Sequence, residues 1–209
     1  MKKQPISTIE ELTALLVKYN VRTDGWGHGG TKSLKDLFEE IQQGTSKPII
    51  FKHMVVRCVT NVAISVYYKP TPSFLQYLEE MKEPKNNGHS RVAHPGFSLL
   101  TDKLANETPQ SAAERCLKDE FNIDPSHFHL RQIGEKMIFD PSCRHFPHLS
   151  GARIQTHIVA EMDSKPYKAY GYKKILPNGQ TIHRSWKPVP FEQDTPYFHF
   201  LLRDLYERT

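Results

Sequence analysis

The feature that most constrains this sequence is a well-marked helix with a carboxylate on its apolar side. Residues 108–121 begin with Thr108, a good N-cap, and Pro109, which suits the first helical position. On a helix that turns about 100° per residue, Glu120 lies about 80° from Ala112, in the middle of the apolar arc. A carboxylate there is costly unless it meets a cation, strong donors or a metal ion. The fold must therefore supply a partner for Glu120.

Two interpretations of Glu120 follow from the residues alone. In the first, Glu120 is a buried structural acid satisfied by an arginine, a tyrosine or backbone amides, with Arg57, Arg91 and Arg115 available in the sequence. In the second, it binds a divalent metal ion, and the adjacent Asp119 supplies a second oxygen ligand. The helix by itself leaves both interpretations open.

The residues around this helix resemble the Nudix box, whose pattern is G-x5-E-x7-R-E-U-x-E-E-x-G-U, with U an aliphatic residue. Within residues 101–123, the positions that match are Glu107, Arg115, Leu117, Asp119, Glu120 and Ile123. The motif is nevertheless degenerate. Thr101 stands at the first glycine, Cys116 at the glutamate after the arginine, Asp119 at the first acid of the pair, and Asn122 at the last glycine.

This resemblance implies a fold and an activity. The fold is an α/β protein, a Nudix-type α/β/α sandwich with a mixed sheet. The activity is a hydrolase that uses Mg²⁺ or Mn²⁺ to cleave a pyrophosphate bond in a nucleoside-diphosphate-linked or related compound. By resemblance, Asp119 and Glu120 are the catalytic residues and metal ligands. Lys103 is expected to contact the substrate phosphate, and Glu107 and Arg115 are expected to brace the motif as scaffold residues.

The cysteine at position 116 limits this chemistry. A neutral thiol is a poor ligand for Mg²⁺, and a thiolate prefers softer metals. Loss of a general base typically lowers a rate by about 10²- to 10⁴-fold. We therefore expect a weak hydrolase, with a catalytically inactive Nudix-fold module that binds a nucleotide, RNA or a protein partner as the alternative. The simplest role for Cys116 itself is a small core residue.

The rest of the chain predicts a helical N-terminal extension over residues 1–47 and a Nudix-like domain over residues 48–209. Apolar spacing predicts helices over 7–19 and 33–43, with Gly44 ending the second. Strands are predicted at 49–51, 54–59, 62–68, 129–139 and 153–161. Further helices are predicted at 73–82 and 195–207, and a hairpin turn at 177–179.

The charge balance favours polyanionic partners. Lys and Arg number 28 against 23 Asp and Glu, which gives a net charge of +5. Residues 165–174 interleave lysines with tyrosines. Aromatic rings stack on bases while lysines meet phosphates, so this segment favours a nucleotide or RNA surface. The alternative interpretation is an amphipathic hairpin.

Other patterns exclude several classes of protein. No apolar run approaches the roughly 20 residues of a membrane-spanning helix, and no apolar stretch of a signal peptide follows the N-terminal lysines. The 3 cysteines lack the spacing of a disulfide framework or a metal site. We therefore expect an intracellular, reducing compartment, the cytoplasm or the nucleus. His145, His148 and His157 lack a recognisable acidic partner for zinc.

Overall fold

The structure, a computed structural model, describes residues 6–71, 74–82, 91–92, 98–141, 143–177 and 179–189. It divides the chain into two compact units. The first unit takes Met1–Val62, Asp102–Thr108 and Glu135–Thr156, and the second takes Ala63–Thr101, Pro109–Gly134 and His157–Thr209. Each unit contains parts of the long strands β2 (Met54–Thr71), β6 (Phe128–Asp140) and β7 (Ser150–Met162). The boundary between extension and domain at residue 48 stays a prediction.

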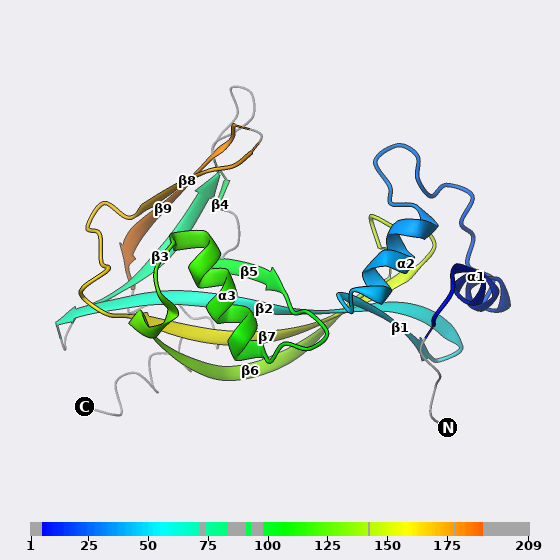
Figure 1. Cartoon of the computed structure of the whole chain (residues 1–209), viewed down its shortest axis with the longest axis horizontal. Coiled ribbons are helices and arrows are strands. Elements are labelled where there is room, and N and C mark those ends of the chain that lie inside the picture. Colours follow the sequence, from blue (N-terminus) through cyan, green and yellow to red (C-terminus); the bar gives the residue numbers. More distant parts are fainter. Residues whose placement is uncertain are drawn as a thin grey trace. The chain divides into compact units, whose positions relative to one another are not determined.

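In the first unit, two capped helices precede a β-hairpin (Figure 1). Helix α1 (Ile9–Lys18) begins with a capping box between Thr8 and Glu11, and α2 (Leu34–Gln42) with one between Ser33 and Asp36. Each cap satisfies backbone N–H groups that the first turn leaves open. Strand β1 (Ser46–Phe51) then pairs antiparallel with the start of β2. The helices predicted over 7–19 and 33–43 are confirmed.

The turn after α2 shows why Gly44 stands there. Its φ is +72°, and a Cβ atom at this position would lie 2.2 Å from the Cβ of Ala105. Only glycine meets both conditions without strain. The predicted end of the second helix at Gly44 is therefore confirmed.

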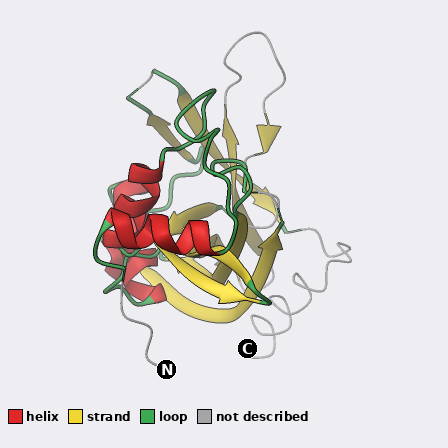
Figure 2. Cartoon of the chain, turned by 90° about the vertical axis from the view of Figure 1, so that its right-hand side faces the viewer, coloured by secondary structure: helices red, strands yellow, loops and turns green. Residues whose placement is uncertain are grey.

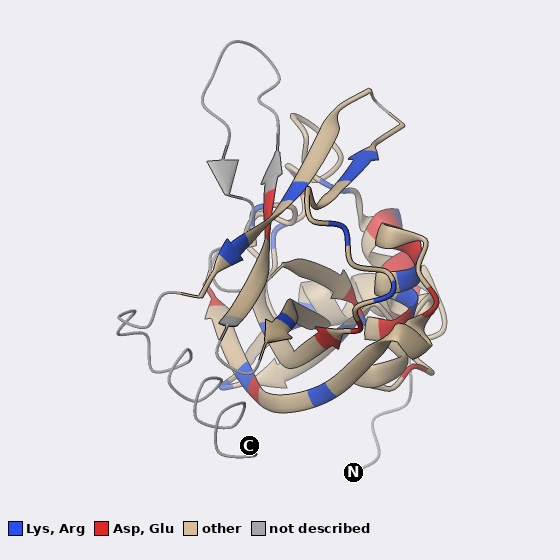
Figure 3. Ribbon diagram, turned by 90° about the vertical axis from the view of Figure 1, so that its left-hand side faces the viewer, with Lys and Arg blue, Asp and Glu red and all other residues tan. Residues whose placement is uncertain are grey.

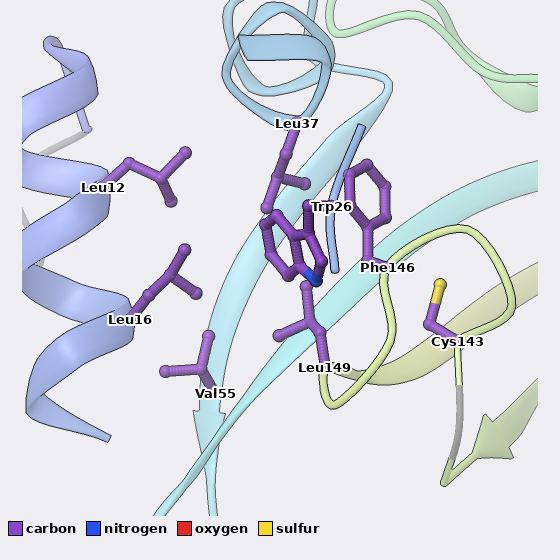
Figure 4. Close-up of a cluster of buried hydrophobic side chains, with 8 residues drawn as sticks. All are labelled: Leu12, Leu16, Trp26, Leu37, Val55, Cys143, Phe146 and Leu149. Atoms are coloured by element: carbon purple, nitrogen blue, oxygen red, sulfur yellow. The ribbon is translucent and has the colours of Figure 1, made fainter. Parts of the chain in front are cut away.

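Side chains from both helices meet loop and strand residues in the core of the first unit (Figure 4). Leu12 and Leu16 on α1 point toward a cluster in which the ring of Trp26 packs edge-on against Phe146, with ring centroids 5.0 Å apart. The indole Nε1 of Trp26 donates a hydrogen bond of 2.8 Å to the carbonyl of Pro147. The N-terminal helices are thus part of a packed core.

The second unit contains parts of β2, β6 and β7, and the strand order of the sheet is β6-β7-β2-β3-β9-β8. Its further strands are β3 (Phe74–Lys82), β4 (Arg91–Val92), β5 (Leu99–Asp102), β8 (Tyr172–Ile175) and β9 (Thr181–Pro188). It also contains helix α3 (Pro109–Phe121) and the short 3₁₀ helix η1 (Pro125–His127). Strands β8 and β9 form an antiparallel hairpin, so the chain turns between Ile175 and Thr181 as predicted, with residue 178 of the predicted turn outside the described residues.

The prediction of a helix over residues 73–82 is wrong, because this segment is strand β3. It pairs antiparallel with β9 from Gln76 to Lys82. Leu75 and Leu78 are both buried, and they lie on opposite faces of the strand. A strand buried on both faces loses its polar alternation, so its apolar residues imitate helical spacing.

The other element predictions fall into two groups. The strand predictions at 49–51, 54–59, 62–68, 129–139 and 153–161 are confirmed by β1, β2, β6 and β7. The helix predicted over 195–207 lies outside the described residues. The described chain combines a mixed β-sheet with helices (Figure 2), so the predicted α/β class is confirmed. Within the described ranges, no helix combines the length and the apolar character that a membrane crossing needs.

Candidate functional site

Helix α3 forms as its sequence predicts. It begins at Pro109 and buries an apolar side made of Ala112, Ala113, Cys116, Leu117 and Phe121. It stops at Asn122, whose φ is +54° and whose N–H donates to the carbonyl of Lys118 at 2.8 Å. Asparagine tolerates this left-handed conformation better than most residues. Asn122 can therefore do the work of the glycine that the Nudix pattern has at this position.

Glu120 lies on α3 with its side chain 24% exposed, and both of its carboxylate oxygens accept hydrogen bonds from cations. The Nζ of Lys174 on β8 donates to Oε1 at 2.8 Å. The Nη2 of Arg184 on β9 donates to Oε2 at 2.7 Å. Glu120 is thus held by two positive charges.

Arg184 connects Glu120 to a second acid. Its side chain is only 1% exposed, and its Nε and Nη2 donate to Oε2 of Glu80 at 3.0 and 2.5 Å. Glu80, Glu120, Lys174 and Arg184 form what we call the four-charge cluster, and its formal charges cancel. Two carboxylates and two cations pair with one another, which lowers the cost of burying such charges, while the Nη1 of Arg184 has no hydrogen-bond partner among the described residues.

Two neighbours hold the arginine in place. Its guanidinium lies 5.3 Å from the ring centroid of Phe121, an arrangement that favours a cation. The backbone of Gly171, at φ +78°, passes so close that a Cβ there would lie 1.8 Å from the carbonyl oxygen of Arg184. Gly171 therefore allows the loop before β8 to close over the arginine's strand.

The charges of the cluster affect the pKa values of Glu120 and of the neighbouring Cys116. Burial acts to raise the pKa of Glu120, but the hydrogen bond from Lys174 and the charges of Arg184 and Lys174 outweigh it, so this pKa is lowered. Burial, followed by the negative charge of Glu120, raises the pKa of Cys116 to about 11. Glu120 is therefore ionised near neutral pH, and Cys116 is a neutral thiol.

The side chains of Cys116, Asp119 and Glu120, as they are arranged here, do not fit a hard divalent cation. Mg²⁺ prefers several oxygen ligands with free lone pairs. Both oxygens of Glu120 are engaged by cations, and the Cys116 thiol is neutral and buried. Asp119 is the solvent-exposed acid beside them. In the part of the chain that the structure describes, no group of three His, Cys, Asp or Glu residues is arranged to hold a metal ion. The ligand role of Asp119 and Glu120 stays a prediction.

Of the other motif residues, Lys103 and Glu107 lie in the first unit and Arg115 lies in the second. The backbone N–H of Leu104 donates to Oε2 of Glu107 at 2.9 Å. The Nζ of Lys103 donates to the carbonyl of Glu107 at 2.9 Å. These bonds close the turn that precedes α3. Arg115 on α3 is half-buried. The phosphate role of Lys103 and the scaffold roles of Glu107 and Arg115 remain predictions.

The partners of Glu120 were missed by the sequence analysis, which considered Arg57, Arg91 and Arg115. The signal that could have found Arg184 is the alternation along β9. Ile182, Arg184 and Trp186 share one buried side of the strand. A charged residue in a run of buried positions needs a buried counter-charge.

A second surface of the same unit carries the lysines and tyrosines of residues 165–174. Tyr167 stacks on Tyr68 with ring centroids 3.9 Å apart, and the indole of Trp186 lies 5.4 Å from Tyr167. This stack anchors the loop, whose tip presents Tyr170 with 99% of its side chain exposed. Residues 164–189 contain no Asp or Glu. Figure 3 shows the Lys and Arg positions of the β8–β9 hairpin. We call residues 165–174, which comprise a loop and the first residues of β8, the basic aromatic loop.

The chain resembles Nudix proteins in structure. A binary complex of a C. elegans Ap4A hydrolase aligns at 14% identity over 71% of this chain and 98% of that one, with a TM-score of 0.41. A MutT/nudix family protein from Listeria innocua aligns at 15% identity over 71% and 94%, with a TM-score of 0.40. The T. brucei MERS1–RNA complex aligns at 18% identity over 70% and 44%, with a TM-score of 0.34.

These likenesses are distant, and they concern the path of the chain. No family model matches the sequence. No curated protein matches it either. The chemistry of this protein has to be argued from its own residues.

Replacement of Glu120 by Gln tests the four-charge cluster. We expect the free energy of unfolding to fall by about 1–3 kcal/mol, because a buried arginine loses one of its charged acceptors. Asp119→Asn is the matched control, since this neighbouring side chain is exposed and its loss should change stability by less than about 0.5 kcal/mol. Denaturant unfolding monitored by circular dichroism measures both. Equal stability of Glu120→Gln and the wild type would contradict the cluster's role.

We also predict that the stability difference between the wild type and Glu120→Gln depends on pH. The pKa of Glu120 is lowered from its ordinary value of 4.5, so its stabilising contribution is complete above that value. The contribution is lost as the pH falls through the lower pKa of the folded protein. We therefore expect the stability difference between wild type and Glu120→Gln to shrink in acid. A difference that grows on acidification would mean that the carboxylate is protonated in the folded protein.

Proposed function

We propose that this chain is a Nudix-like binding module that recognises a nucleotide unit without using Asp119 and Glu120 as metal ligands. The observation that carries the proposal is the engagement of both Glu120 oxygens by Lys174 and Arg184. A metal ion bound to Glu120 would lie beside two positive charges, and if it displaced Arg184, the buried guanidinium would lose one of its two carboxylates. The cost of that rearrangement favours binding without a metal.

The ligand class follows from the chemistry of the basic aromatic loop. Tyr170 is a fully exposed ring, and the neighbouring Lys168 and Lys173 are exposed cations. A ring of this kind offers a stacking face to a base, and the lysines meet the phosphate that accompanies the base. The stack of Tyr167 on Tyr68 gives the loop a fixed support. The ligand is therefore a base linked to phosphate, either as a free nucleotide or within a single strand of RNA.

Replacement of Tyr170 by Ala tests this ligand class. Loss of the ring on which one base stacks should weaken binding by roughly 5- to 150-fold, which corresponds to about 1–3 kcal/mol. Fluorescence anisotropy with a short single-stranded RNA, in EDTA and in Mg²⁺, measures the affinity, and a free nucleoside diphosphate added as competitor separates the two sources of the ligand. Phe51→Ala is the control, because Phe51 is a half-exposed ring outside this loop. Equal affinities of wild type and Tyr170→Ala for RNA and nucleotide would reject the loop as the site.

The second candidate function is the weak Mg²⁺- or Mn²⁺-dependent pyrophosphate hydrolase. The spacing of the motif and the exposure of Asp119 favour it. Where the metal is bound, it would supply positive charge to the pyrophosphate oxygens and a nucleophilic water. Glu120 would then have to share its carboxylate between that ion and its two cations, which makes the two functions experimentally distinct.

Turnover of dinucleoside polyphosphates and nucleotide sugars discriminates between the candidates. A metal-dependent hydrolase should lose most of its activity in Asp119→Asn, a variant whose fold we expect to be intact, and Mg²⁺ should raise its melting temperature. The binding module should show no turnover and the same melting temperature with Mg²⁺ and with EDTA. Metal-dependent turnover that Asp119→Asn abolishes would therefore replace the first candidate by the second. A protein that binds neither ligand and captures a protein partner would reject both.

A further inference from the structure

The last residues of strand β6 expose an apolar run that the first unit does not use. Each residue from Glu135 to Asp140 is exposed. The side chains of Met137, Ile138 and Phe139 are 66%, 38% and 47% exposed. Successive side chains of a strand point to opposite faces, so apolar groups stand on both faces of this segment. Isolated exposed apolar residues are common, but three in succession on one strand indicate a contact surface.

This segment belongs to an edge strand of the sheet. Strand β6 is at the end of the strand order, and among the described residues it pairs with β7 and with no other strand. Unpaired N–H and C=O groups along an edge recruit another strand, and proteins normally protect such edges with proline, bulges or charges. The centre of this edge, Met137-Ile138-Phe139, contains no proline and no charged residue. We propose that residues 135–140 of β6 form an interface with the same residues of a second copy of this chain.

The sequence of the segment is complementary to itself. In an antiparallel pairing centred on Ile138, Lys136 of each copy lies opposite Asp140 of the other, which makes two opposite-charge pairs. Met137 and Phe139 lie opposite one another on the other face, which makes two apolar pairs. Cross-strand pairs of both kinds stabilise antiparallel strands, and a twofold axis at Ile138 repeats each of them. This charge complementarity favours a second copy over a foreign strand.

Charge reversal tests both the interface and its register. Lys136→Asp places like charges opposite one another at two sites, and so does Asp140→Lys. Each single variant should weaken dimerisation by about five- to hundredfold. The double variant Lys136→Asp/Asp140→Lys restores opposite charges and should dimerise like the wild type. Sedimentation velocity of the full chain over a range of concentrations measures the dissociation constants, and Lys35→Asp, an exposed lysine on α2, is the charge-matched control.

Hydrogen exchange gives a second measurement that does not depend on comparing variants. The amides of residues 135–140 should become protected as the wild-type concentration rises through the dissociation constant. A wild type that stays monomeric at high micromolar concentration would overturn the proposal, and capture of a foreign β-strand would then account for the edge. A dimer that neither single reversal weakens would also overturn it. A dimer weakened by both reversals and rescued by the double variant would establish the interface.

Discussion

The ion pairs between Arg184 and the two acids Glu80 and Glu120 are the interaction on which the second unit depends. They connect the central strand β3, the hairpin strand β9 and helix α3, three elements that are distant in sequence. A guanidinium that is 1% exposed is shielded from bulk water, so its position is dictated by its acceptors. Whatever the chain binds, the carboxylate of α3 is first a structural group that fixes the helix to the sheet.

Sequence reasoning predicted the elements whose signals are local. Pro109 at the start of α3 and the glycine after α2 each act on their own turn, and both were predicted from the sequence. Strand β3 was misread, because burial on both faces removes the alternation that marks a strand. Glu120 was correctly recognised as an acid that needs a partner. The alternation along β9 marks Arg184 as buried but does not say which acid it meets, because Arg184 is 64 residues away in the chain and strand pairing with β3 and β8 brings it beside α3.

The candidate site residues also divide into those identified by a local motif and those whose contacts depend on the fold. Asp119 and Glu120 were found by motif spacing, and the structure places Asp119 in solvent and Glu120 between two cations. Lys174 lies within the basic segment that the sequence singled out for nucleic acid, yet its ammonium group is engaged by Glu120. The loop's capacity for an anion therefore rests on its exposed lysines and on the Tyr170 ring. A basic stretch in a sequence does not distinguish cations that neutralise the protein's own acids from those that face solvent.

The departure from the motif at Cys116 is consistent with the cluster. Cys116 is buried one turn before Glu120 on the same helix, and the negative charge of Glu120 raises its pKa. A glutamate at this position would add a third carboxylate to a cluster that holds two cations, and the formal sum would change from zero to −1. A buried excess charge without a counter-ion is strongly unfavourable, so a third acid would require either a metal ion or another cation. The neutral thiol removes that requirement. The cysteine and the engaged arginine therefore describe one chemical state, in which the helix is neutralised by the protein's own cations.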